Sequence, residues 1–398
     1  MKIVDVETFV VANPPPSFGG RYFTFVKLIS SDGIVGYGEA YAATFHPEVV
    51  SGMLRDVAAR HLMGHDPFDI ERFWRSAHGR GFTQRPDLSL QGVISALEMA
   101  CWDIVGKSVQ QPVYKLLGGQ VHERLRTYTY LYPEAGDSAD VYRDPGLAAE
   151  RAAEYVARGF TAVKFDPAGP YTIMGGHQPS PRRLELSVEF ARAIRDAVGS
   201  DADLLFGTHG QFTSSGAIRL ASKLEPYDPL WFEEPTPPDD MVGMARVAAA
   251  TSIPIATGER LATKTEFARV LEAGAANILQ PNLGRAGGIL EGKKIAALAE
   301  AHNAQIAPHL YCGPIVGAAN AQLAACSPNF LILEGILDWG GFHAEVLKTP
   351  LHWEEGYLIP STAPGLGVEL DEDVARAHPY DGDGLHLDMT EKPFGLED

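Results

Sequence analysis

From about residue 121 onward, short apolar runs alternate with amphipathic stretches whose apolar residues recur at helical spacing. Examples of the helical stretches are RRLELSVEFARAIRDAV (182–198) and GGILEGKKIAALAEAH (287–302). The apolar runs that predict strands are 125–132, 160–165, 203–207, 229–233, 253–257, 276–280, 304–308 and 329–333. Eight strands with intervening helices predict a parallel β/α barrel. An open doubly wound sheet is the alternative, and it is disfavoured because no Gly-rich fingerprint follows the first strand.

The first 120 residues follow a different pattern. The segments MKIVDVETFVVAN (1–13) and YFTFVKLISSDGIVGYGEA (22–40) predict an antiparallel meander with a Ser-Asp-Gly turn. Helical patterns follow at 47–61 and 89–107. We therefore expect an α+β domain over residues 1–120 and a barrel over 121–350. The segment 351–398 is too short to fold alone, and we expect it to pack back on the first domain.

Composition and charge narrow the classes of partner. The chain of 398 residues is 45% hydrophobic and 21% charged, as in ordinary globular proteins. Its net charge of −18 argues against nucleic acid and anionic membranes, so an anionic substrate would need local positive charge at its site. No signal peptide or long apolar run is evident, and three cysteines predict reduced thiols in a cytosolic protein.

Polar side chains gather at the predicted strand ends, where barrels of this type place their active sites. In chain order these positions are Lys164, Asp166, Gly207, His209, Glu233, Glu259, Asn282, His309 and Glu334. A single glutamate there is usually a helix cap or a solvated charge, but several carboxylates at one mouth repel each other unless a cation lies between them. Oxygen ligands favour Mg²⁺ over Zn²⁺. The set suits metal-assisted removal of a proton next to a carboxylate, through an enediolate.

Several motifs together resemble the mandelate racemase branch of the enolase superfamily, and nearly the whole chain takes part. The motifs are WFEEP (231–235), ATGER (256–260), LQPNLGRAGGI (279–289), APHLYCGP (307–314), LILEG (331–335) and SALEMACWDIVGK (95–107). Within that branch, THGQ (208–211) and HLYCGPIVGAA (309–319) are most similar to the galactonate dehydratase group of acid-sugar dehydratases. The resemblance implies an α/β fold: a modified (β/α)7β barrel of the TIM type with an N-terminal α+β capping domain.

The resemblance also implies roles for individual residues. Glu233 and Glu259 match magnesium ligands, and Glu334 matches a residue near the substrate carboxylate or the metal-bound oxygens. The implied catalytic residues are Lys164, at the end of the second barrel strand, His209, the extra histidine of the galactonate dehydratase group, and His309, an acid or base.

Two positions depart from the family pattern. Gly207 stands where the family has its first aspartate ligand, and Asn282 stands where an aspartate pairs with His309. We expect Asp166, inward on the adjacent strand, to supply the third metal ligand, with His209 or water as alternatives. Asn282 can hydrogen-bond His309 but cannot raise its basicity, so we expect a neutral imidazole or a weaker base.

Specificity is expected to come from the capping domain. The segments ANPPPSFGGRYF (12–23) and HGRGFTQRPD (78–87) are the predicted lids, and the long loop 166–183, with His177, is expected to be functional. The arginines predicted to clamp a carboxylate or hydroxyls are Arg21, Arg80 and Arg85.

The leading functional interpretation is a lyase that uses Mg²⁺ to dehydrate a sugar acid to a 2-keto-3-deoxy acid. A racemase, an epimerase or a lactone cycloisomerase would use the same residues, and a catalytically silent barrel that only binds a ligand is a further alternative. The expected partner is a small-molecule carboxylate, and we expect a homo-oligomer.

Overall fold

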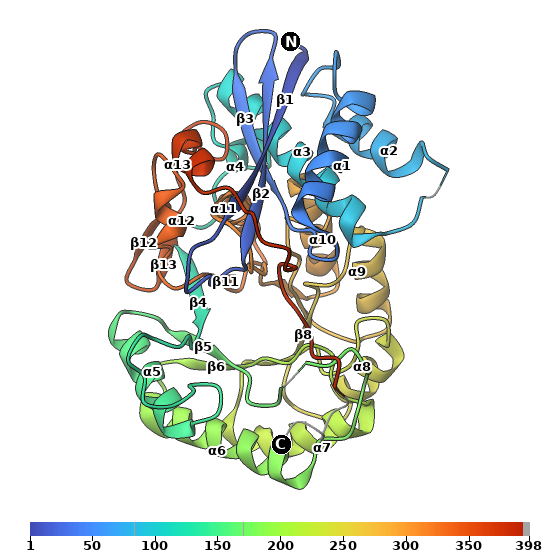
Figure 1. The fold of residues 1–398 in the computed structure, drawn as a ribbon. Coiled ribbons are helices and arrows are strands. Elements are labelled where there is room, and N and C mark those ends of the chain that lie inside the picture. Colours follow the sequence, from blue (N-terminus) through green and yellow to red (C-terminus); the bar gives the residue numbers. More distant parts are fainter. Residues whose placement is uncertain (83, 170, 393–398) are drawn as a thin grey trace.

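Three antiparallel strands open the chain: β1 (Ile3–Ala12), β2 (Tyr22–Ser30) and β3 (Val35–Ala40). The computed structural model describes residues 1–82, 84–169 and 171–392. Gly33, at a positive φ of 76°, lies in the predicted Ser-Asp-Gly turn between β2 and β3. The helices that follow are α1 (Pro47–His61), α2 (Ile70–Gly79), α3 (Leu88–Ser108) and α4 (Val113–Leu116). They lie beside the three-stranded sheet at one end of the molecule (Figure 1).

Helix α3 packs directly on β3 because two glycines let the backbones approach. A Cβ atom at Gly38 would lie 1.9 Å from the carbonyl oxygen of Ala96, and one at Gly36 would lie 2.2 Å from that of Ala100. The side chain of Asp87 caps the start of the helix by accepting the backbone N–H of Leu90. Among the described residues, α3 alone is long and apolar enough to cross a membrane, yet 83% of its apolar stretch is buried inside the protein.

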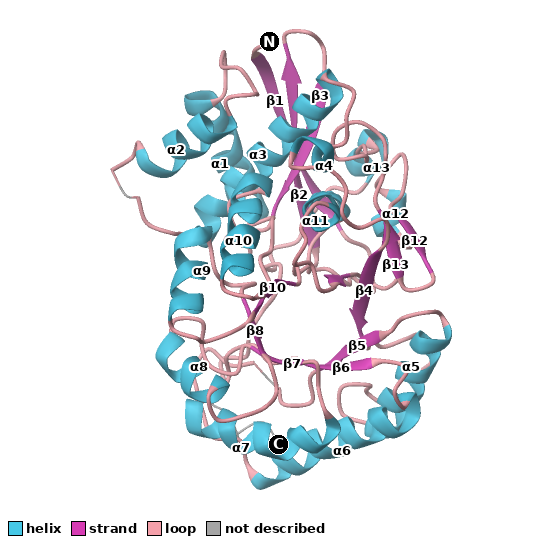
Figure 2. Cartoon of the chain, turned by 180° about the vertical axis from the view of Figure 1, so that it is seen from behind, coloured by secondary structure: helices cyan, strands magenta, loops and turns pink. Residues whose placement is uncertain are grey.

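Eight parallel strands form the second part, as the apolar runs predict. They are β4 (Leu125–Tyr130), β5 (Ala162–Phe165), β6 (Asp203–Phe206), β7 (Trp231–Glu233), β8 (Ile255–Thr257), β9 (Ile278–Leu279), β10 (Gln305–Ile306) and β11 (Leu333–Glu334). Each strand from β4 to β10 pairs with the next along the chain. Ile306 then bridges to Phe330, and β11 pairs with β4. The strands therefore close into a ring, and the barrel prediction is confirmed (Figure 2).

Helices cover the outside of this ring (Figure 2). They are α5 (Pro145–Ala157), α6 (Pro181–Val198), α7 (Ser214–Leu224), α8 (Met241–Ala248), α9 (Thr263–Glu272), α10 (Ile289–Ala301) and α11 (Pro314–Ala325), with a 3-10 turn at Glu225–Tyr227. Inside the ring, apolar side chains from the strands pack together in one buried cluster that includes Ala162, Leu205, Trp231 and Ala307. Because inward positions recur every second residue, the next inward position on each of these strands faces the carboxyl end of the barrel.

Two buried carboxylates of the first part cap helices of the barrel. Glu39 on β3 accepts the backbone N–H groups of Gly313 and Val316 at the start of α11, at 2.5 and 3.0 Å. Glu98 on α3 accepts those of Ile289 and Leu290 at the start of α10, both at 2.8 Å. Burial raises the pKa of each carboxyl to about 7, although the helix N–H groups oppose that rise. These contacts fix the chain next to the ends of β9 and β10.

The C-terminal segment contacts both parts. The hairpin β12 (His352–Glu354) and β13 (Tyr357–Ile359) adds to the barrel, since β13 pairs antiparallel with β4. The short helices α12 (Phe342–Glu345) and α13 (Glu372–Ala377) flank it, and α13 packs on β1. Residues 385–392, here called the strap, then run from the capping domain to the loop after β5 (Figure 1). There the backbone of Thr390 hydrogen-bonds Tyr171 and Ile173, at 2.9 and 3.1 Å.

Candidate active site

A cavity of about 850 Å³ opens at the carboxyl ends of the barrel strands. Five of the polar residues predicted at the strand ends line it: Asp166, His209, Glu259, His309 and Glu334. The aromatic side chains of its wall include Tyr41, Tyr130, Tyr132, Tyr171 and Tyr311. The strap adds Leu385, Leu387, Asp388, Met389 and Glu391. The structure thus brings these five residues to one cavity, while Lys164, Gly207, Glu233 and Asn282 are not among its lining residues.

Lys164 and Glu233 form an ion pair beneath this cavity. The Lys164 Nζ atom lies 2.5 Å from Glu233 Oε1 and 3.6 Å from Glu334 Oε1, and the side chains of Lys164 and Glu233 are wholly buried. Glu233 Oε2 also accepts hydrogen bonds of 2.9 Å from Trp231 and Gln280. Burial by itself lowers the pKa of Lys164, but the nearby glutamates raise it above its ordinary value. Lys164 is therefore an ammonium ion in this arrangement.

The space beside Gly207 is filled by neighbouring side chains. A Cβ atom at this position would lie 2.9 Å from the hydroxyl of Tyr130 and 3.1 Å from Cε of Lys164. Both neighbours come from strands on one side, β4 and β5. The position where the family has an aspartate ligand is thus closed to a longer side chain unless Tyr130 and Lys164 move.

His209 lies between two carboxylates. Its Nδ1 atom is 3.6 Å from Asp166 Oδ2, and its Nε2 atom is 3.7 Å from Glu259 Oε2. The hydroxyl of Tyr171 donates to the same Asp166 oxygen and holds that carboxylate in place. Burial lowers the pKa of His209, but Glu259 and Asp166 raise it to a net value above the ordinary one.

His209, Glu233 and Glu259 are spaced to hold a metal ion. One ligand atom from each lies within 4.8 Å of the others. Burial raises the pKa of Glu259, but His309 and His209 lower it well below its ordinary value, so this carboxylate is ionised. Two carboxylates and an imidazole suit a divalent cation. Asp166, predicted as the third ligand, lies outside this group, because its carboxylate faces His209 Nδ1 and Tyr171.

Asn282 and His309 are in contact at the opposite side of Glu259. The Asn282 Nδ2 atom lies 2.9 Å from His309 Nδ1, and His309 Nε2 lies 3.0 Å from Glu259 Oε2. Glu334 Oε2 accepts the backbone N–H of Leu310 at 2.9 Å and lies 3.7 Å from the same His309 nitrogen.

Two arginines that the sequence analysis did not single out supply positive charge. Arg260 and Arg285 both line the cavity. Arg260 pairs with the buried Glu234 at 2.8 Å, and the Arg285 guanidinium lies 3.5 Å from the ring centroid of Tyr41. Both belong to motifs named above, Arg260 to ATGER and Arg285 to LQPNLGRAGGI. Because the net charge of −18 implies that an anionic substrate needs positive charge at its site, these two arginines could have been predicted there.

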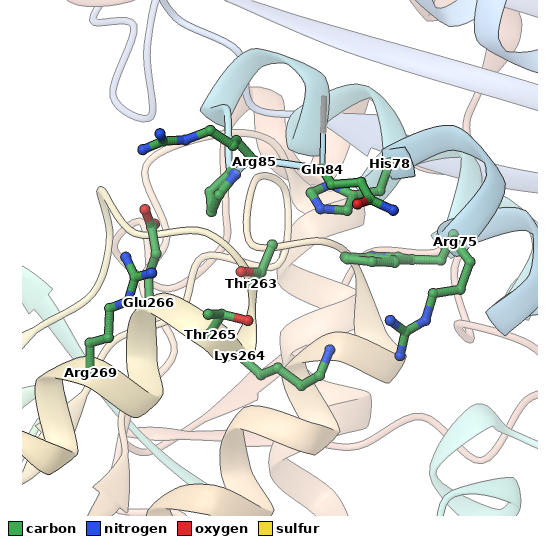
Figure 3. A pocket seen from close by; sticks show the side chains of 11 residues that line it. Arg75, His78, Gln84, Arg85, Thr263, Lys264, Thr265, Glu266 and Arg269 are labelled. Carbon is green, nitrogen blue, oxygen red and sulfur yellow. The ribbon is translucent and has the colours of Figure 1, made fainter. Parts of the chain in front are cut away.

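The three arginines predicted to clamp the substrate lie elsewhere. Arg21 donates to Asp388 and to the carbonyl of Leu385, so it holds the strap. Arg80 lines a small surface pocket with His61 and Asp69. Arg85 lines a separate cavity of about 430 Å³ between the loop after α2 and the start of α9, with Lys264 and Arg269 (Figure 3). Sequence position alone did not show which basic side chains turn toward the barrel mouth.

The described residues of the two segments predicted as lids do not line the cavity in this structure, and other segments form its wall. Residues 12–23 do not line the cavity, but Phe18 stacks on the wall residue Tyr132 with centroids 4.1 Å apart. Within 78–87, the described residues do not line it either. Residues 41–44, part of the loop 166–183 and the strap do. His177 in that loop packs on Phe212 and is not a lining residue.

Comparison with protein families agrees with this arrangement. Residues 6–118 match the N-terminal domain of mandelate racemase and muconate lactonizing enzyme, and residues 147–374 match the enolase C-terminal domain-like family. The chain belongs to the mandelate racemase/muconate lactonizing enzyme family of the enolase superfamily.

Relatives and solved structures in this family are similar over nearly the full chain. A D-galactonate dehydratase of Ralstonia pickettii (strain 12J) is 36% identical, over 94% of this chain and 93% of its own. A D-gluconate dehydratase of Thermoproteus tenax is 34% identical, over 94% of this chain and 72% of its own. A solved structure from Labrenzia alexandrii DFL-11, described as a mandelate racemase/muconate lactonizing enzyme, is 64% identical with a TM-score of 0.96, covering 98% of this chain and all of its own.

Proposed function

We propose that this protein is a hydro-lyase that dehydrates a sugar acid to a 2-keto-3-deoxy acid with the help of Mg²⁺. The observation that carries the proposal is the meeting of Glu259, His209 and His309 at one cavity with Glu233 and Lys164 directly beneath them. Relatives named D-galactonate and D-gluconate dehydratase in the same family support a sugar acid as the substrate.

A divalent ion would be held by Glu233, Glu259 and His209, and when bound it supplies positive charge where negative charge develops on the substrate carboxylate. Arg285 and Arg260 add positive charge at the cavity wall and orient the anionic substrate. The hydroxyl of Tyr130 is buried without a hydrogen-bond partner among the described residues, so it is available to a substrate hydroxyl.

The proton next to the substrate carboxylate passes to a nitrogen of this chain. The two proposed acceptors are Lys164 in its uncharged amine form and His209 where it does not hold the ion, since both lie beside Glu233 or Glu259. Glu334 and His309 complete the floor of the cavity. The same nitrogen then returns the proton to the neighbouring hydroxyl, which leaves as water and yields the enol of the keto acid.

The test is a screen of sugar acids with Mg²⁺ for keto-acid formation, with a parallel reaction in D₂O. Keto acid with the wild-type protein supports the proposal, and Glu259→Gln should lower its rate at least about 100-fold because charge stabilisation at the carboxylate is lost. Glu272→Gln, an exposed site on α9, is the matched control and should be unchanged. Deuterium incorporation without keto acid would instead identify an epimerase, and neither product nor Mg²⁺ binding would identify a ligand-binding barrel.

A further inference from the structure

The side-chain amide of Asn282 is held in one orientation. Its Oδ1 atom accepts the backbone N–H of Gly284 at 2.8 Å, and its Nδ2 atom faces His309 Nδ1 at 2.9 Å. Asn282 is wholly buried, so no water competes for these atoms. Rotation of the amide by half a turn would place its NH₂ group against the N–H of Gly284, donor against donor. The hydrogen bond from Gly284 therefore decides which amide atom His309 meets.

This orientation determines the tautomer of His309. The amide NH₂ group can only donate, so Nδ1 of His309 must be the acceptor. A neutral imidazole has one donor and one acceptor nitrogen, which places the ring proton on Nε2. That nitrogen lies 3.0 Å from Glu259 Oε2 and 3.7 Å from Glu334 Oε2, and both are acceptors. With this tautomer, the acceptor nitrogen Nδ1 faces a donor, and the donor nitrogen Nε2 faces acceptors.

The carboxylates around His309, by contrast, favour a protonated ring. Burial lowers the pKa of His309, while Glu259 and Glu334 raise it to a net value above the ordinary one. An imidazolium ion, however, carries a hydrogen on Nδ1 as well, and that hydrogen would point at the NH₂ group of Asn282. Glu259 Oε2 has no hydrogen-bond partner among the described residues, and Glu334 Oε2 lies 3.7 Å from Nε2, so a hydrogen on Nε2 faces acceptors without meeting a donor. The form with a hydrogen on Nε2 and none on Nδ1 is therefore the one that fits the Asn282 amide.

We propose that Asn282 holds the His309 ring with its hydrogen on Nε2, so that His309 polarises the substrate through Nε2–H and does not take its proton. An aspartate at position 282 would accept a hydrogen from Nδ1 and leave a lone pair on Nε2, the arrangement of a base. The Asn282 amide places the lone pair on Nδ1 and the hydrogen on Nε2 instead. His309 then ends the reaction with the protons it began with, and a neutral imidazole can act in this way on a carbonyl or carboxylate oxygen. Asn282 is a positioning residue for that donor.

His209 has different neighbours from His309. The acceptor nearest to its Nδ1 atom is the carboxylate of Asp166, at 3.6 Å, which Tyr171 holds in place. Its Nε2 atom lies 3.7 Å from Glu259 Oε2, so both ring nitrogens of His209 face carboxylates. The carboxylate partner that family members place behind the histidine at position 309 thus stands behind His209 in this chain. The two histidines of the cavity therefore differ in what faces Nδ1: a carboxylate at His209 and an amide NH₂ group at His309.

The tautomer can be measured in the protein without substrate, by neutron diffraction from crystals exchanged into D₂O. The expected result is deuterium on Nε2 of His309 and none on Nδ1. Asn282→Asp should move the deuterium to Nδ1. Asn320→Asp is the matched control, because the Asn320 amide donates to the backbone carbonyl of His309 at 3.0 Å and does not contact its ring. Deuterium on Nδ1 of the wild-type ring would overturn the proposal.

The role in the reaction rests on the proposed function and needs a kinetic comparison. His309→Gln keeps an N–H donor but cannot accept a proton, whereas His309→Leu removes the donor. Turnover should fall less than about 10-fold in the Gln variant and at least about 100-fold in the Leu variant, the scale of a lost proton-handling or donor group. Equal losses of about 100-fold in both would show that His309 is a base. If the wild-type protein turns over no sugar acid, the proposed function fails, while the diffraction result still decides the tautomer.

Discussion

The ammonium nitrogen of Lys164 on β5 lies 2.5 Å from a carboxylate oxygen of Glu233 on β7, and neither side chain is exposed. Strand β6 runs between them and ends at Phe206, one residue before Gly207. Because Gly207 has no side chain, Lys164 and Tyr130 occupy the space above it, and Lys164 reaches across to Glu233. The loss of an aspartate at position 207 and the pairing of Lys164 with Glu233 are therefore two aspects of one arrangement.

Removal of this buried ammonium should destabilise the protein strongly. Lys164→Met leaves Glu233 charged and unpaired, which is expected to lower the free energy of unfolding by about 3–5 kcal/mol. Urea unfolding at pH 7 in the presence of a chelator measures the difference. Arg60→Ala, which removes an exposed pair with Asp56, is the control and should leave the midpoint unchanged. Equal stability of the Lys164 variant and the wild type would contradict a charged pair.

The proposed metal ligands can be ranked by titration calorimetry with Mg²⁺. Glu233→Gln, Glu259→Gln and His209→Asn should each weaken binding by at least about 10-fold, because each removes a ligand atom. Asp166→Asn should weaken it less, since this residue orients His209 and does not reach the ion. A stronger loss in the Asp166 variant than in the His209 variant would restore Asp166 as the third ligand.

An aspartate at position 207 should not be accommodated without cost. Its Cβ atom would meet the Tyr130 hydroxyl at 2.9 Å and Lys164 Cε at 3.1 Å, so Gly207→Asp is expected to lower the free energy of unfolding by about 1–3 kcal/mol. Adding Tyr130→Phe removes the nearest atom and should recover part of the loss. Thermal unfolding of the single and double variants measures both effects. A single variant as stable as the wild type would show that the space is open.

Acid should weaken the attachment of the strap through His386. Burial lowers the pKa of this histidine to about 3, against an ordinary value of about 6.5 in the unfolded chain. Between these values the unfolded chain binds a proton that the folded protein does not. The stabilisation is therefore complete above about pH 6.5 and is lost as the pH falls, on the order of 2 kcal/mol by pH 5. His386→Phe should flatten the dependence in urea unfolding between pH 7 and 5, and an unchanged slope would contradict the assignment.

Arg21 is expected to affect the substrate through the strap. Its guanidinium donates to Asp388 at 2.5 Å and to the carbonyl of Leu385 at 2.6 Å, and both partners line the cavity. Arg21→Ala should speed proteolytic cleavage within 385–392 and raise KM several-fold while kcat changes less, because wall contacts are loosened and the reacting groups are not. Arg376→Ala, an exposed residue paired with Glu7, is the control. Unchanged cleavage and KM in the Arg21 variant would exclude this role.

The periodic pattern by itself determined the barrel and the inward row of site residues. Alternation along a strand is a local property of the extended backbone, so Ala162 inside the ring predicts Lys164 inside, and Leu205 predicts Gly207. Parallel strands end on one side of a barrel, which is why residues far apart in the chain could be assigned to one mouth before any contact was known. The family motifs added the expected metal ligands and the two departures at Gly207 and Asn282.

Only the tertiary structure decided what surrounds those two positions. Tyr130 and Lys164 fill the space at Gly207 because neighbouring strands place them there, and Gly284 orients the Asn282 amide through one backbone hydrogen bond. The strap reaches Tyr171 across more than 200 residues of chain, and no local pattern predicts that pairing. The arginines also could not be placed from the sequence, because all of them carry the same charge. Only the packing of the folded chain puts Arg260 and Arg285 at the cavity and Arg80 and Arg85 away from it.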